Sequence, residues 1–298
     1  MRRSTSPVEA VARATTAPAV NPSAAPAPTK GAILERNRIE YDDAADPYWR
    51  LTVYEPSHRG WGFASVAGRR ILDEGAARAG LGPGSRALEL CSGLGDTCRY
   101  LASRHGCRVT GVEINRHQVT RAAARLARLD PEAAARVDYV EADVLDWRPP
   151  DRYDLVLAVD ALLLLEDRGR ALATARAALA PGGLLAVADV FAGPAITERV
   201  REYVWSEDGI LGLPTPAEQV ADLAAGGFVE VETADWTGLA VDCFRRMIDA
   251  SHRHRDALVA AKGPARYRRW MRNARLYRRW FDRRVLVYGA VFARRRAA

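Results

Sequence analysis

Three acidic residues carry the clearest chemical signal in this chain, because each ends an apolar segment. Glu89 stands near the end of residues 86–90, Glu113 at the end of 108–113, and Asp143 just after 137–142. The carboxyl ends of parallel strands meet at one edge of a sheet, so we expect the three carboxylates to line one crevice. Such a crevice repels a phosphate and accepts a cationic ligand, or one with an ammonium group. The alternative is that each acid merely caps the helix that follows its strand.

A glycine-bearing turn, ELCSGLGDTC at residues 89–98, joins the first of these segments to a helix expected to open at Thr97. Glycines let backbone N–H groups approach a ligand closely, and the start of a helix adds a partial positive charge. Cys98 stands where a dinucleotide fingerprint has its third glycine, and the phosphate-binding G-x-x-x-x-G-K-[ST] is absent from the sequence. A pyrophosphate ligand is therefore disfavoured. Glu113 follows Gly95 by about 20 residues, the spacing expected of a carboxylate that binds ribose hydroxyls.

The elements that must position these residues alternate between strands and helices. We expect strands at residues 86–90, 108–113, 137–142, 153–159, 183–190, 228–234 and 285–293. Helices are expected at 97–104, 116–129, 168–179 and 215–225, and a long helical segment at 239–283. Pro181, Gly182 and Gly183 are expected to make the turn into the fifth strand. This alternation predicts an α/β fold with a parallel sheet covered on both faces.

The composition argues against several classes of protein. The longest apolar run, residues 155–165, is interrupted by Asp160 and is shorter than the roughly 20 residues that cross a bilayer, so we expect no membrane span. The first 30 residues lack the apolar segment of a secretion signal, which favours a cytoplasmic protein. The net charge is +7, and nearly all of the basic residues are arginine. We attribute this basicity to genome composition rather than to nucleic-acid binding. The four cysteines lack metal-ligand spacing, so we expect free thiols and no metal site.

In combination, these segments resemble the class I S-adenosylmethionine-dependent methyltransferases, in the branch that acts on small molecules such as natural products. The likeness rests on ELCSGLG at 89–95, GVEIN at 111–115, EAD at 141–143, DLVLAVDALLLLED at 154–167 and LAPGGLLAVAD at 179–189, followed by TPAEQVADLAAGGFVEV and RRVLVYGAVFARR. It covers roughly residues 41–296. The resemblance implies a Rossmann-like sheet of seven mostly parallel strands, with an antiparallel last strand and a helical insertion before it.

The resemblance also implies S-adenosylmethionine as cofactor and assigns its parts to successive strand ends. The turn after the first strand would hold the methionine part through Glu89, Cys91, Ser92, Gly93 and Gly95. The ends of the next two strands would hold the nucleoside, with Glu113 on the ribose hydroxyls, Ile114 against the adenine, Asp143 on its amino group and Val144 presenting its backbone. The remaining cofactor residues are expected to be Val159, Asp160, Ala161, Gln118 and Trp61.

Two departures from the family pattern affect the chemistry. Cys91 replaces the first glycine of the motif, and Leu164 stands near a position where many relatives carry histidine, so no base is expected there. Methyl transfer from a sulfonium mainly requires alignment of donor and acceptor, and a general base is optional. We expect His58 to be the catalytic base and Tyr41 a second catalytic residue. His58 fixing its own loop through a backbone hydrogen bond is the open alternative.

Composition and the resemblance together divide the chain. Residues 1–30, rich in Ala, Pro, Ser and Thr, are expected to be a disordered tail because they cannot bury enough apolar surface. Residues 31–298 are expected to form a single methyltransferase domain, with an N-terminal helical lid at 31–80, a cofactor-binding core at 81–238, a helical insertion on the acceptor side at 239–283 and the last strand at 284–298.

The expected function is methyl transfer to nitrogen or carbon, with oxygen also open, of a small aromatic or amine-containing specialised metabolite such as an indole. Trp205, Tyr267 and Trp270 are candidates for an apolar acceptor pocket, although aromatic residues at helical spacing more often belong to the core. We expect a small-molecule substrate, a monomer or homodimer, and no membrane or nucleic-acid partner. Two other functions stay open, an RNA or other nucleic-acid methyltransferase and a nicotinamide-dependent oxidoreductase on a Rossmann fold.

Overall fold

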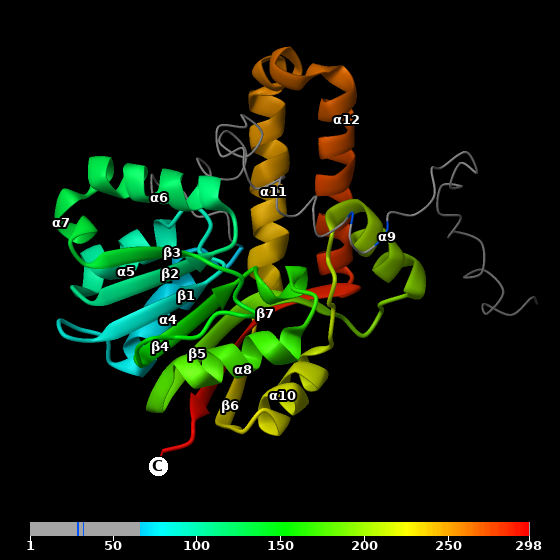
Figure 1. Cartoon of the computed structure of the whole chain (residues 1–298). Coiled ribbons are helices and arrows are strands. Elements are labelled where there is room, and N and C mark those ends of the chain that lie inside the picture. Colours follow the sequence, from blue (N-terminus) through cyan, green and yellow to red (C-terminus); the bar gives the residue numbers. More distant parts are fainter. Residues whose placement is uncertain (1–28, 30–31, 33–65, 298) are drawn as a thin grey trace, which may run out of the picture.

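Seven strands form one twisted sheet in the computed structural model, which describes residues 29, 32 and 66–297. In chain order the strands are β1 Arg86–Leu90, β2 Arg108–Glu113, β3 Val137–Glu141, β4 Tyr153–Val159, β5 Leu179–Ala192, β6 Phe228–Asp235 and β7 Leu286–Arg295. Their spatial order is β3-β2-β1-β4-β5-β7-β6 (Figure 1). All pairings are parallel except those of β7, which runs antiparallel to both β5 and β6. The predicted fold class is therefore confirmed.

Helices cover both faces of the sheet, as predicted. They are α4 Arg69–Ala79, α5 Asp96–His105, α6 Arg116–Leu129, α7 Pro131–Ala134, α8 Arg168–Ala178, α9 Glu198–Asp208, α10 Pro216–Ala225, α11 Thr237–Arg253 and α12 Arg255–Asp282, with a short 3-10 helix η2 at Leu162–Leu164. Successive side chains of a strand point to opposite faces. Accordingly Leu155 and Leu157 of β4 join one apolar cluster, whereas Val156 and Ala158 join the other.

Several elements differ from the predicted ones, among them the short helices α7 and η2, which were not predicted. The Pro181-Gly182-Gly183 break lies within β5 as an irregularity, because Leu179 already pairs with Tyr153 before Leu184 pairs with Leu155. The polar helix α9 was not predicted, since Val204 is its one buried residue and apolar spacing gives no signal. Helix α4 lies within the stretch expected to form a lid, but it packs against β4 and β5 with Ile71 and Leu72 buried.

The predicted helical segment at 239–283 is a hairpin of two helices, α11 and α12, which stands away from the sheet beside α9 (Figure 1). The first interruption is at His254, where α11 ends and α12 begins. A second interruption, at Lys262 and Gly263 ahead of Pro264, divides α12. The indole Nε1 of Trp270 donates to Ser251 Oγ at 3.0 Å, and Tyr267 is buried against the same turn of α11. These two aromatic residues pack inside the hairpin, which favours the core interpretation over the acceptor pocket.

The positive charge of the chain is concentrated in this hairpin. Residues 237–283 contain 13 arginines and lysines against four aspartates, a net charge of +9. The other 251 residues contain 31 basic and 33 acidic residues, a net charge of −2. Genome composition would distribute arginine along the whole chain, so it does not explain this segregation.

The hairpin begins at the edge of the sheet where the parallel strands end. Since β5 and β6 both pair antiparallel with β7, β6 runs in the same direction as β1 to β5. Helix α11 starts two residues after β6 ends, and therefore leaves from the carboxyl edge that also carries Glu113 and Asp160. Among residues 66–297, none of the helices combines the length and apolarity needed to cross a bilayer.

Candidate active site

The turn after β1 has a backbone that only small residues adopt readily. Cys91, Gly93 and Gly95 all have positive φ angles, of 58°, 52° and 73°. Two backbone hydrogen bonds fold the turn: Ser92 N–H donates to Val112 O at 3.0 Å, and Gly95 N–H donates to Ser92 O at 2.9 Å. Helix α5 begins directly after Gly95, and its first turn receives no side-chain cap from the described residues. Its first N–H groups therefore remain available to a ligand at the carboxyl edge.

Glu113 connects the turn to the neighbouring strand end. Its Oε2 accepts from Gly93 N–H at 3.0 Å, and its Oε1 accepts from Asn115 N–H at 3.0 Å. Burial raises the pKa of this carboxyl above its ordinary value, against the effect of these N–H donors. The N–H of Ile114 acts in the same direction, so at least one of the roughly four acceptor positions of the carboxylate remains for a hydroxyl group of a ligand. Ile114, beside it, is 38% exposed and offers an apolar surface at the same edge.

Glu89 lies behind the turn. The side chain is buried, and Cys98 Sγ donates to its Oε2 at 3.1 Å. Burial raises the pKa of Glu89 to about 8, although the Cys98 thiol lowers it. The free protein therefore holds Glu89 mainly in its neutral form at pH 7, and a cation brought against it would favour the ionised form.

Cys91 and Ser92 belong to the turn itself, and their side chains differ in environment. Burial raises the pKa of the half-buried Cys91 thiol far above the physiological range, with the acids Glu113 and Glu89 acting in the same direction. A thiol in this state is a poor nucleophile. The Ser92 hydroxyl is buried without a hydrogen-bond partner among the described residues, and Gly111 of β2 lies so close that a Cβ there would be 2.8 Å from Ser92 Oγ.

The residues expected at the adenine end also gather near this edge. Asp143 Oδ1 accepts from Leu145 N–H at 2.9 Å, and Val144 between them is buried. The buried Gln118 amide lies against the turn, since a Cβ at Gly93 would be 3.3 Å from Gln118 Oε1. The side chain of Asp143 thus holds its own loop, and its remaining carboxylate oxygen is the one that a ligand could use.

The ends of β4 and β5 bring a second acidic group to the site. Asp160 has a φ of 49°, and its N–H donates to Ala188 O at 2.8 Å. Of its two neighbours in the chain, Val159 is half-buried and Ala161 is buried. Asp189, next along β5, is fully buried and accepts from Leu163 N–H at 3.1 Å. Burial raises the pKa of Asp189, as does Asp160, whereas Arg168 lowers it. Sequence patterns did not indicate Asp189 or Arg168 as site residues.

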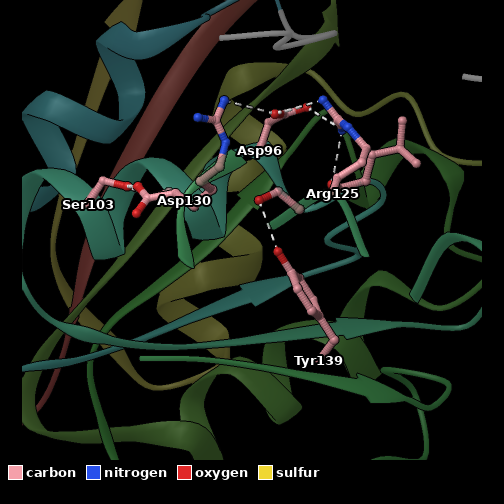
Figure 2. Close-up of polar contacts among 8 residues, drawn as sticks. Asp96, Ser103, Arg125, Asp130 and Tyr139 are labelled. Carbon is pink, nitrogen blue, oxygen red and sulfur yellow. Dashed lines mark hydrogen bonds and ion pairs between the residues drawn. The ribbon is translucent and has the colours of Figure 1, made fainter. Parts of the chain in front are cut away.

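Polar contacts beneath the turn were also missed by sequence reasoning. Arg125 of α6 binds both carboxylate oxygens of Asp96, at 2.9 and 3.2 Å, and Tyr139 of β3 donates to Gly95 O at 3.1 Å (Figure 2). Sequence patterns gave no signal for these contacts, because tyrosine is common in strands and arginine is common on helices.

Three expected site residues, Tyr41, His58 and Trp61, lie outside the described residues, and their roles stay predictions. The part of the chain that the structure describes has no cluster of three or more His, Cys, Asp or Glu side chains able to hold a metal ion.

The chain is similar to several methyltransferases. A family described as "Methyltransferase domain" matches residues 88–185. The 27-O-demethylrifamycin SV methyltransferase of Amycolatopsis mediterranei is 30% identical over 205 residues, which are 65% of this chain and 74% of that protein.

Two solved structures share the fold. Phosphoethanolamine N-methyltransferase 2 of Haemonchus contortus, in complex with phosphomonomethylethanolamine and S-adenosylhomocysteine, has a TM-score of 0.76 at 18% identity, over 90% of this chain and 60% of that chain. The [4+2]-cyclase SpnF has a TM-score of 0.70 at 24% identity, over 93% of this chain and all of that chain (100%).

Proposed function

Since this chain belongs to the class I S-adenosylmethionine-dependent methyltransferases, we propose that it transfers the methyl group of S-adenosylmethionine to a hydroxyl oxygen of a small specialised metabolite. The enzyme class and the cofactor follow from the family. The acceptor atom is our proposal, supported by the name of the Amycolatopsis relative, which denotes a substrate lacking a methyl group on oxygen. The broader expectation of nitrogen or carbon becomes an alternative outcome of the test below.

The arrangement of Glu113, Gly93 and Ile114 is the observation that supports this cofactor site most directly. The carboxylate is held by backbone N–H groups, among them those of Gly93 and Asn115, and keeps acceptor capacity for a ribose hydroxyl, and the exposed isoleucine side chain can pack on adenine. On the other side of the turn, the first N–H groups of α5 can receive the methionine carboxylate, and Glu89 can ionise against the ammonium group. The residues present therefore fit S-adenosylmethionine.

When bound, the cofactor supplies an electrophilic methyl group on a positively charged sulfur. The chain's own contribution is to align the acceptor with that methyl group and to keep water out. We assign the acceptor side to the ends of β4 and β5 and to the base of the α11–α12 hairpin, since all of these lie at the carboxyl edge. His58 is proposed as the base that removes the acceptor's proton, with Tyr41 as a second candidate.

Incubating the purified protein with S-adenosylmethionine carrying a deuterated methyl group and with metabolite extracts tests this proposal. We expect calorimetry to detect binding of S-adenosylhomocysteine, and mass spectrometry to find the label on oxygen of one small molecule. Label on nitrogen or carbon would correct the acceptor atom alone. Label on RNA instead would favour the nucleic-acid alternative, and failure to bind the cofactor would refute the proposed function. Binding without any transfer would favour a chemistry other than methylation, as the cyclase with this fold illustrates.

A further inference from the structure

Arg125 reaches from α6 to the underside of the glycine turn. Its Nη1 donates to Leu94 O at 3.3 Å and to Asp96 Oδ2 at 2.9 Å, and its Nη2 donates to Asp96 Oδ1 at 3.2 Å (Figure 2). Arg99 also reaches Asp96 Oδ1, at 3.4 Å. One guanidinium therefore joins a backbone carbonyl of the turn to the first side chain of α5.

These contacts decide where the Asp96 carboxylate lies. An acid in the first turn of a helix can fold back and accept from the first N–H groups. Here Asp96 is held by two arginines, and it gives α5 no capping hydrogen bond. The N–H groups that a cofactor carboxylate would need are thus kept from an internal competitor.

Tyr139 holds the next peptide of the turn from β3. Its hydroxyl donates to Gly95 O at 3.1 Å, and the same oxygen accepts the helical bond from Arg99 N–H at 2.9 Å. A trans peptide points its C=O and its N–H in opposite directions. Gly95 O and the N–H of Asp96 belong to the same peptide. Because Tyr139 holds Gly95 O, the N–H of Asp96 points away from Tyr139 and out of the start of α5, toward the carboxyl edge.

The fit between Tyr139 and Gly95 is close. A Cβ added at Gly95 would lie 2.0 Å from Tyr139 Oη, so the ring occupies the space beside the glycine. Arg125 and Tyr139 lie on different elements but act on adjacent peptides, those of Leu94 and Gly95 (Figure 2).

We propose that Arg125 and Tyr139 are positioning residues of this methyltransferase, which hold the turn and the start of α5 in the orientation that binds S-adenosylmethionine without touching the cofactor themselves. This rests on the proposed role of the turn as the cofactor cradle. Losing the Tyr139 hydroxyl removes one hydrogen bond, and losing the Arg125 guanidinium removes three, two of which are charge-assisted on both sides.

The test uses Tyr139→Phe and Arg125→Met, with a matched control for each. Tyr153→Phe removes the hydroxyl of another buried tyrosine, which bonds Thr110 Oγ1 at 3.1 Å on the sheet and not the turn. Arg128→Met removes an exposed arginine from the same helix α6. Binding of S-adenosylhomocysteine is measured by calorimetry, and amide hydrogen exchange of residues 93–98 is measured in the free protein.

We expect Tyr139→Phe to weaken binding about three- to tenfold and Arg125→Met by more than about tenfold, with both controls within about twofold of the wild type. Exchange at residues 93–98 should accelerate in the two test variants only. With substrate, KM for the cofactor should rise more than kcat falls, and Arg125→Lys should recover part of the loss.

Unchanged binding and exchange in both test variants, with wild-type protein that binds the cofactor, would overturn the positioning role alone. Accelerated exchange together with unchanged affinity would overturn it as well, because the turn would then be held without consequence for the cofactor. Wild-type protein that fails to bind S-adenosylhomocysteine would overturn the proposed function first, and this proposal with it.

Discussion

The thiol of Cys98 donates to the carboxyl of Glu89 across 3.1 Å, nine positions apart in sequence and buried behind the cofactor turn. The thiol is uncharged, so it stabilises the carboxylate only weakly, and burial dominates. Glu89 thus has a pKa of about 8 against an ordinary value of 4.5. An acid kept neutral within the binding site has consequences both for stability and for ligand binding.

The first consequence concerns the pH dependence of folding. Below about pH 4.5 the carboxyl is neutral in both states, whereas between about 4.5 and 8 the unfolded chain releases a proton that the folded protein keeps. Stability contributed by this group therefore falls as pH rises through that window. We expect Glu89→Gln to be more stable than the wild type by a few kcal/mol at pH 8.5, and equally stable near pH 4.5. Urea unfolding at several pH values measures the difference, and a pH-independent difference would contradict this origin.

Cofactor binding should release a proton. The ammonium group of S-adenosylmethionine, placed against Glu89, lowers the pKa of that carboxyl and favours its ionised form. Near pH 7 we expect close to one proton to leave on binding. Calorimetry in buffers of different ionisation enthalpy counts that proton, and Glu89→Gln should bind more weakly and release none. An equal count for both proteins would show that the proton comes from elsewhere.

Sequence patterns predicted the sheet, its flanking helices and the acids at the strand ends, because each depends on local periodicity or on where a strand stops. They did not predict the contacts of Tyr139 or Arg125 with the turn, which link residues 44 and 31 positions apart. The division of residues 239–283 into two helices was also missed, because His254, where α11 ends, is neither glycine nor proline, although Gly263 and Pro264 do mark the second interruption, within α12. Periodicity reports which face is buried and says nothing of what a polar side chain touches.

Gly95→Ala should abolish cofactor binding through a steric clash. The new Cβ would meet Tyr139 Oη at 2.0 Å, within the turn that must approach the cofactor. Gly182→Ala is a matched control, because its φ of 76° equals that of Gly95 to within a few degrees (73°) and its Cβ would meet nothing within 4 Å. Each variant places alanine at a positive φ and so carries backbone strain of about 1 kcal/mol or somewhat more. Calorimetry should find binding in the Gly182 variant only, and binding in both would mean that Tyr139 moves aside.

Cys91→Gly should be tolerated, because this position has the left-handed backbone that glycine adopts without strain. Cys91 has a φ of 58°, and relief of this strain offsets the extra entropy that glycine gains in the unfolded chain, so stability should change by about 1 kcal/mol or less. Cys91→Val places a β-branched side chain in the same conformation and should lower stability by about 1–3 kcal/mol. Thermal melts and S-adenosylhomocysteine binding compare the two variants.

The same paired variants examine whether the thiol takes part in the reaction. Burial raises the pKa of the Cys91 thiol, so iodoacetamide at pH 8 should modify it slowly in the native protein. Turnover by Cys91→Gly at a rate close to that of the wild type would exclude a nucleophilic role. Loss of turnover with intact cofactor binding would require the thiol in the chemistry and contradict the lining role given to it here.

The charge segregation makes the molecule an electric dipole, with the hairpin as its positive pole. At physiological ionic strength a charge is screened beyond about 8 Å, whereas α11, with 17 residues, is roughly 25 Å long. The field of the hairpin is therefore felt near its own surface and at the carboxyl edge from which it rises, and hardly at the far side of the sheet. An anionic acceptor would approach the site from the hairpin side faster than a neutral one of the same size, and added salt would remove that advantage.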